Sequence, residues 1–120
     1  MLTVEVIEDD PAMRALLLEW LADEGYRVQV RARVGVAAIS GVAAVVVNLS
    51  NLSLQGAETI RHVKRLYPGA ALIGLSTQVI EPLAADSRQA QAWGLDELVP
   101  KPCSRRVLVG AVAGAIVRVA

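Results

Sequence analysis

The sequence predicts an α/β fold in which helices cover both faces of a five-stranded parallel sheet. Short apolar runs alternate with segments of helical periodicity, and this alternation continues along the 120 residues. Strands that alternate with helices pair in parallel, and the connections between them cross over with a right-handed sense. No linker or second compositional zone interrupts the pattern, so we expect a single domain over residues 1–120.

The first half of the chain contains two clear strands and one clear helix. Thr3–Ile7 is predicted as a strand, and Asp10-Pro11 then supplies a helix N-cap and a first helical residue. Gly25 ends that helix, and Val28–Val30 is a second, shorter strand. Residues near 35–40 form only a short, weak helix. The first helix presents an apolar side made by residues at helical spacing, namely Met13, Leu16, Leu17, Trp20 and Leu21.

The second half repeats the alternation more regularly. The β-branched run Val45–Val47 is typical of a strand that is buried on both faces. In chain order there follow a helix after Gly56 that ends at Pro68-Gly69, a strand at Ala71–Leu75, a helix from Glu81-Pro82 to Gly94, a strand at Leu98-Val99, and a last helix from Ser104 toward Arg118.

Composition excludes several functions. Twelve basic residues balance twelve acidic ones, so no electrostatic argument favours nucleic acid or an anionic membrane. Cys103 is the only cysteine and His62 the only histidine, which argues against disulfides, cysteine-based zinc sites and catalytic triads. Glu5 places a charge too early in the chain for a signal peptide. The charge-free part of the last helix, Val107–Val117, is too short to span a bilayer. We expect a cytoplasmic location.

Polar residues follow the predicted strands at one edge of the sheet. Glu8, Asp9 and Asp10 follow the first strand, while Asn48 and the hydroxyl residue Ser76 follow the third and fourth. Lys101 follows the fifth. Ligands of open parallel sheets bind beyond the carboxyl ends of the strands, so these side chains face one crevice. A magnesium-assisted phosphate site needs such hard oxygen ligands together with a cation and a hydroxyl.

In the order and spacing of these groups, the chain resembles the receiver domains of bacterial two-component response regulators. The resemblance covers nearly the whole chain and rests on four segments: Val6-Ile7-Glu8-Asp9-Asp10-Pro11, Val45-Val46-Val47-Asn48 with Gly56 eight residues later, Leu75-Ser76, and Lys101-Pro102. It implies a flavodoxin-like fold with strand order 2-1-3-4-5. It also implies that Glu8 and Asp9 match the magnesium-binding acids and Ser76 the hydroxyl that follows the phosphoryl group. Lys101 would match the phosphate-binding lysine, whose bond to the next proline is typically cis.

Three positions depart from the family pattern. Asn48 occupies the place of the phosphoacceptor aspartate, Leu98 that of the switch aromatic, and Cys103 that of an aromatic often found after Lys-Pro. The resemblance therefore predicts an atypical, phosphorylation-independent pseudo-receiver that is not an enzyme and has no cofactor. Any Mg²⁺ site at Glu8 and Asp9 would be weak or vestigial.

Other interpretations of these residues remain open. The acids Glu8 and Asp9 can serve only to cap the first helix and to pair with Lys101, and Ser76 can simply bond backbone. A phosphorylatable receiver that uses Ser50 or Asp10 as acceptor is one alternative function. Another is an unrelated flavodoxin-like ligand-binding domain, although the chain has no glycine-rich phosphate loop after the first strand.

The last helix suggests how the chain contacts other proteins. Val107–Val117 contains no charge and includes Gly110 and Gly114, so this helix can pack on the sheet with one side and on a partner with the other. We expect a protein partner, with a homodimer as one form of it. Trp93 either fills space beside Leu98 or faces that partner. Cys103 is either a reactive thiol, because Lys101 and a helix start would both lower its pKa, or a small apolar residue in the place of an aromatic ring.

Overall fold

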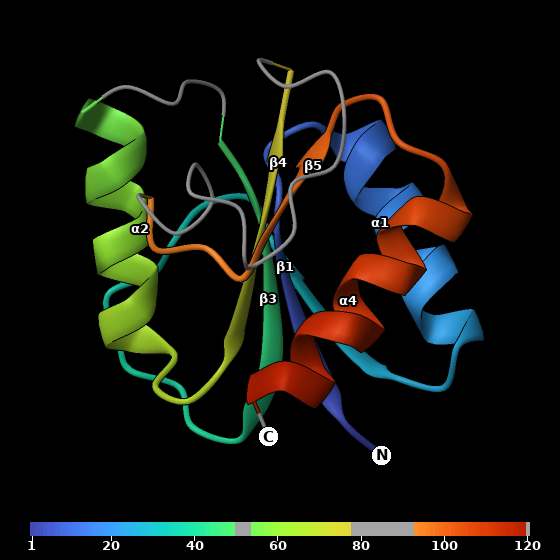
Figure 1. The fold of residues 1–120 in the computed structure, drawn as a ribbon, viewed down its shortest axis with the longest axis horizontal. Coiled ribbons are helices and arrows are strands. Elements are labelled where there is room, and N and C mark those ends of the chain that lie inside the picture. The colour runs from blue at the N-terminus through green and yellow to red at the C-terminus, as the bar shows by residue number, and fades with distance from the viewer. Residues whose placement is uncertain (50–53, 78–92, 120) are drawn as a thin grey trace.

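A five-stranded parallel sheet forms the centre of the protein. The computed structural model describes residues 1–49, 54–77 and 93–119. The strands lie side by side in the order β2-β1-β3-β4-β5, and every neighbouring pair is parallel (Figure 1). This order and the α/β class confirm the predicted fold. In chain order the elements are β1 (Thr3–Ile7), α1 (Pro11–Asp23), β2 (Arg27–Arg31), β3 (Val42–Asn48), α2 (Leu54–Leu66), β4 (Ala71–Ser76), β5 (Glu97–Pro100) and α4 (Arg105–Val119).

Helices lie on both faces of the sheet. Helices α1 and α4 lie together on one face and α2 lies on the other (Figure 1). Arg105 in α4 forms ion pairs with Asp23 and Glu24 at the end of α1, each at 3.2 Å, which joins the two helices. The predicted helix from Glu81-Pro82 to Gly94 falls largely on residues 78–92, outside the described part of the chain.

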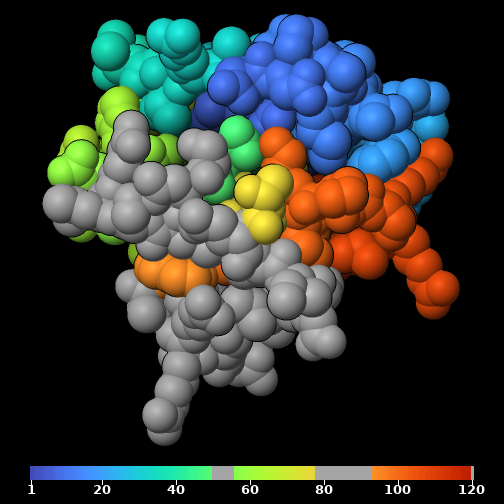
Figure 2. Space-filling model, turned by 90° about the horizontal axis from the view of Figure 1, so that it is seen from above, coloured from blue at the N-terminus to red at the C-terminus, as the bar shows by residue number. Residues whose placement is uncertain are grey.

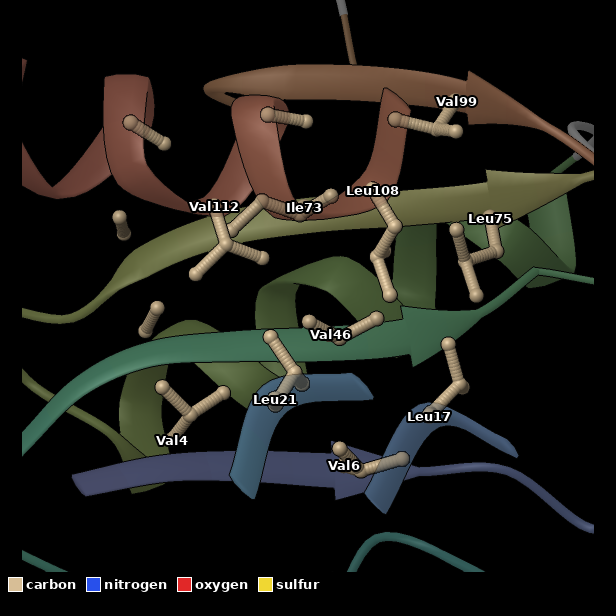
Figure 3. Packing of buried hydrophobic residues seen from close by; sticks show 14 residues of the cluster. Val4, Val6, Leu17, Leu21, Val46, Ile73, Leu75, Val99, Leu108 and Val112 are labelled. Carbon is tan, nitrogen blue, oxygen red and sulfur yellow. The ribbon is translucent and has the colours of Figure 1, made fainter. Parts of the chain in front are cut away.

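Alternation along each strand divides the core into two clusters. Val4 and Val6 of β1 point toward α1 and α4, whereas Glu5 and Ile7 point toward the α2 face. Figure 3 shows the first cluster, in which Leu17 and Leu21 of α1 and Leu108 and Val112 of α4 pack on β1, β3 and β4. Truncating one such fully buried leucine to alanine costs about 2–5 kcal/mol.

Local signals place the ends of α1. The Asp10 carboxylate accepts a hydrogen bond from the Ala12 amide at 3.2 Å, with Pro11 as the first helical residue, as predicted. Gly25 follows the helix with a φ of +92°, a conformation that favours glycine. Leu16, which we placed on the apolar side, is instead 43% exposed. Only Leu17 and Leu21 of the predicted set are fully buried, because the helix contacts the sheet along a narrower stripe.

Two predictions about helices were wrong. Residues 32–41, which connect β2 to β3, contain no helix; Gly35 and Gly41 interrupt any helical run there. Tertiary contacts hold this connection instead, since the Ile39 amide donates to the Leu66 carbonyl at 2.7 Å and Val34 packs on the second cluster. Helix α2 begins at Leu54, before Gly56, because a glycine inside a helix costs only about 1 kcal/mol.

None of the helices in the described ranges is long and apolar enough to cross a membrane.

Candidate functional site

The predicted polar groups meet at the carboxyl edge of the sheet. Figure 2 looks down on this edge, where the blue β1–α1 segment, the green end of β3 and the yellow end of β4 come together. Glu8 follows β1, Asn48 ends β3, Ser76 ends β4, and Lys101 follows β5. Because β1, β3, β4 and β5 are adjacent and parallel, the sheet itself brings these residues to one place.

Lys101 is the centre of the site. Its ammonium Nζ lies 2.8 Å from Oε1 of Glu8 and donates to Oδ1 of Asn48 at 3.1 Å. Glu8 is only 1% exposed, so its charge is compensated by the ion pair with Lys101. Of the two interpretations of Lys101, the side chains adopt the salt bridge, and they do so with Glu8 and not with Asp9.

Asn48 uses both ends of its amide. Its oxygen accepts from Lys101, while its nitrogen Nδ2 donates to Oδ1 of Asp9 over a long distance of 3.4 Å. An amide can face a cation and an anion at once because it is an acceptor at one end and a donor at the other. A carboxylate at position 48 would lose the donor and place a second negative charge beside Asp9.

Backbone contacts fix β5 against β4 beside the site. The amide of Lys101 donates to the carbonyl of Ser76 at 2.8 Å, and the Lys101-Pro102 peptide bond is cis. Ser76 is fully buried. Together these contacts hold the Lys101 side chain over the ends of β1 and β3.

Comparison with known proteins identifies the fold. No protein-family model and no curated protein matches the sequence. Among solved structures, the chain is similar to a response regulator receiver domain protein from Clostridium thermocellum. The two share 20% identity and a TM-score of 0.72, over 98% of this chain and 96% of that one.

A receiver domain of a sensor histidine kinase from Pseudomonas aeruginosa, with a magnesium ion coordinated in its active site cleft, has 18% identity and a TM-score of 0.69 over 96% and 97% of the two chains. The 120-residue chain described here therefore has the receiver-domain fold. A putative pilus assembly-related protein from Burkholderia pseudomallei is also similar, with 22% identity and a TM-score of 0.75 over 100% of this chain and 92% of that one.

Leu98, which the resemblance places at the switch-aromatic position, is completely buried. It belongs to the second cluster, and Trp93 packs against that cluster from the side. A Cβ atom at Gly74 would lie 2.9 Å from side-chain atoms of Leu49 and Leu95 and 3.1 Å from Leu98. The leucine therefore sits in a tightly packed apolar layer, with Trp93 against its edge.

Of the two interpretations of Cys103, the structure favours the small apolar residue over the reactive thiol. The thiol is half-buried against the first cluster, and burial raises its pKa more than the nearby charge of Lys101 lowers it. The sequence showed the favourable charge but not the desolvation, which has the larger effect here.

The ligand set does not fit a tight magnesium site of the receiver type. Within the described residues, no three His, Cys, Asp or Glu side chains come together as metal ligands. One oxygen of Glu8 is bound to Lys101, and the oxygen of Asn48 also accepts from Lys101. Oε2 of Glu8, which is buried with no hydrogen-bond partner, and exposed Asp9 are the oxygens left for a cation. Hard cations are held by the number and charge of their ligands, so this set is poor.

Two arginines near the site were not found by sequence reasoning. Nη1 of Arg14, one turn into α1, donates to the carbonyl of Glu8 at 3.0 Å and so holds the β1–α1 connection. Arg33, just after β2, lines a cavity that also contacts Asp9 and Asn48. Neither position has a sequence signal, because an arginine on a helix or in a connection is most often solvated.

A buried ion pair lies on the α2 face, away from the site. Oε1 of Glu5 in β1 pairs with Nε of Arg31 at 2.7 Å, and Glu5 is completely buried. The hydroxyl of Tyr67 is buried nearby, and burial raises its pKa, with the charge of Glu5 adding to that effect. A signal existed for this pair, since Glu5 alternates with core valines in a strand covered on both faces.

Proposed function

We propose that this protein is an atypical receiver domain that signals by protein contact and does not depend on phosphorylation at position 48. The receiver fold supports the first half of the proposal. The observation that carries the second half is the Asn48 amide, which accepts from Lys101 and donates toward Asp9. A neutral amide at position 48 thus leaves the Lys101 ammonium paired with the Glu8 carboxylate.

The chemistry of the amide supports this proposal. A receiver acceptor attacks phosphorus with a carboxylate oxygen, and an amide oxygen carries no full charge. Its nitrogen lone pair is delocalised into the carbonyl, and no neighbouring base can activate it, because activation requires an acidic proton. The proposal therefore includes no catalytic activity and no cofactor.

The test is incubation of the purified protein with acetyl phosphate and Mg²⁺, followed by intact mass measurement. We expect no phosphoryl adduct on the wild type and partial labelling of Asn48→Asp, since Glu8, Ser76 and Lys101 are still in place. Asn48→Ala is the matched control and should remain unlabelled. An adduct on freshly purified wild type, mapped to any residue, would refute phosphorylation independence.

The same experiment decides between alternative acceptors. The Asp10 carboxylate accepts from the Ala12 amide as the N-cap of α1, which engages one of its two oxygens. Ser50 lies outside the described residues. Peptide mapping of any labelled protein would assign the adduct to one of these two side chains.

We propose the outer side of α4 as the contact surface and a second copy of the chain as its partner. Leu108, Ala111, Val112 and Ala115 face the sheet, so the outer side consists of Val107, Gly110, Ala113 and Val117. Val117 is 75% exposed. Two of the arginines in α4 are paired within the chain, Arg105 with Asp23 and Glu24 and Arg118 with Glu97 at 2.6 Å, whereas Arg106 in the first turn is exposed.

A two-fold axis brings identical patches together, and an uncharged patch meets its copy without repulsion. Sedimentation at high micromolar concentration should show a dimer for the wild type and a monomer for Val117→Glu. Val36→Glu is the matched control, because Val36 is 94% exposed in the β2–β3 connection, and it should remain dimeric. A monomeric wild type would refute the homodimer.

A further inference from the structure

A cavity of about 180 Å³ lies beside the site on the α2 face of the sheet. It opens where the connection between β2 and β3 lacks a helix. Figure 2 shows this part of the surface, where the teal connection meets the blue β1–α1 segment. The lining residues come from the ends of β1 and β3, from the start of the connection and from α2: Ile7, Asp9, Ala32, Arg33, Val34, Val47, Asn48 and Thr59.

The cavity is apolar at its base and charged at its mouth. Ile7 and Val47 are almost fully buried, and Val34 is partly buried beside them. Asp9 and Arg33 are exposed at the rim. A small ligand can therefore place an apolar group on the base while its polar groups remain near water, as is usual in small-molecule sites.

Neither rim charge is paired with an opposite charge. Within residues 1–49, 54–77 and 93–119, neither Asp9 nor Arg33 takes part in an ion pair. Among these residues, the Asp9 carboxylate accepts one long hydrogen bond, from the Asn48 amide nitrogen. One small cavity thus presents an unpaired acid and an unpaired guanidinium. An anion alone would meet the charge of Asp9, and a cation alone that of Arg33.

We propose that this cavity binds a small zwitterion, an α-amino acid with a short aliphatic side chain. The carboxylate pairs with Arg33 and the ammonium group with Asp9, and the side chain contacts Ile7, Val34 and Val47. The size agrees with this class of ligand, because a cavity of about 150 Å³ holds benzene, with roughly six heavy atoms. The slightly larger volume here accepts the aliphatic part of an amino acid from alanine to valine, with the two charged groups at the mouth.

The test is a titration of the ¹⁵N-labelled protein with L-valine, up to about 50 mM, because a ligand with so few atoms binds in about the millimolar range. We expect saturable shift changes at the amides of Asp9, Arg33, Asn48 and Thr59. Isobutyrate and isobutylamine, which each carry one of the two charges, should bind at least about tenfold more weakly, which is a loss of one charge-assisted contact.

Two variants separate the two charge contacts. Arg33→Gln and Asp9→Asn should each weaken L-valine binding about tenfold. The dispersed ¹⁵N spectrum of each variant serves as the check that the fold is retained. Arg106→Gln, an exposed arginine on α4, is the matched control and should bind like the wild type. No saturable shift with L-valine, equal affinity for isobutyrate, or unchanged affinity in Arg33→Gln would each overturn the proposal.

Discussion

Replacing Lys101 with methionine should strongly destabilise the protein, because it leaves the buried Glu8 carboxylate without its ion-pair partner. Glu8 is 1% exposed, its Oε1 bonds to Lys101 at 2.8 Å, and its Oε2 has no hydrogen-bond partner among the described residues. Breaking a buried pair costs about 3–5 kcal/mol. The Lys101 side chain is 18% exposed, so water reaches the remaining charge and we expect the lower value, about 3 kcal/mol.

The expected change in melting temperature follows from the length of the chain. Unfolding entropy is about 2.1 cal/mol/K per residue, or about 0.25 kcal/mol/K for this protein, so Lys101→Met should melt about 12 °C below the wild type. Urea denaturation followed by circular dichroism gives the free energy of unfolding, and a scan gives the melting temperature.

A second substitution identifies the cause. Glu8→Gln removes the stranded charge, so the double variant Glu8→Gln/Lys101→Met should recover about half or more of the lost stability. A Lys101→Met variant within about 0.5 kcal/mol of the wild type would refute the reasoning, and so would strict additivity of the two substitutions.

Three further outcomes are expected. Calorimetric titration with Mg²⁺ should detect no micromolar site in the wild type and tighter binding by Asn48→Asp, because the aspartate adds a charged ligand; micromolar binding by the wild type would contradict this. Cys103 should react with iodoacetamide more slowly in the native protein than in urea at pH 8, since burial raises its pKa and reduces the thiolate fraction; equal rates would show that the thiol is accessible and ionised. In urea denaturation, Gly74→Ala should lower the free energy of unfolding by about 1–3 kcal/mol, because the added Cβ would lie 2.9 Å from two leucine side chains. Gly110→Ala has open space around its Cβ and should raise the free energy of unfolding by up to about 1 kcal/mol.

Local chemistry made most of the fold predictable. Asp10-Pro11 marked the start of α1, Gly25 its end, and the valines of β3 a strand covered on both sides. Each of these signals determines the conformation of only the few residues beside it, so contacts with distant elements did not override the prediction. The predictions that failed, such as the weak helix at residues 35–40, concerned segments whose conformation depends on contacts with distant elements.

The candidate site was predictable in its position but less so in its interactions. Parallel strands bring Glu8, Asn48 and Lys101 to one edge wherever the alternation holds, so their proximity followed from topology. Which acid Lys101 contacts depends on side-chain reach and burial, and the sequence left that open. The cavity beside Arg33 was not predictable, since the course of the connection that lines it depends on contacts with distant elements.

The ion pair between Glu5 and Arg31 has a consequence for the alignment of the edge strand β2. Most of β2 is exposed, so apolar burial distinguishes poorly between its possible alignments with β1. In the native alignment Arg31 lies opposite Ile7, on the face of the sheet where Glu5 points. A slip of one residue would turn the guanidinium to the opposite face and strand a carboxylate in the core. The pair therefore selects one strand alignment by penalising its neighbours, even if it adds little net stability itself.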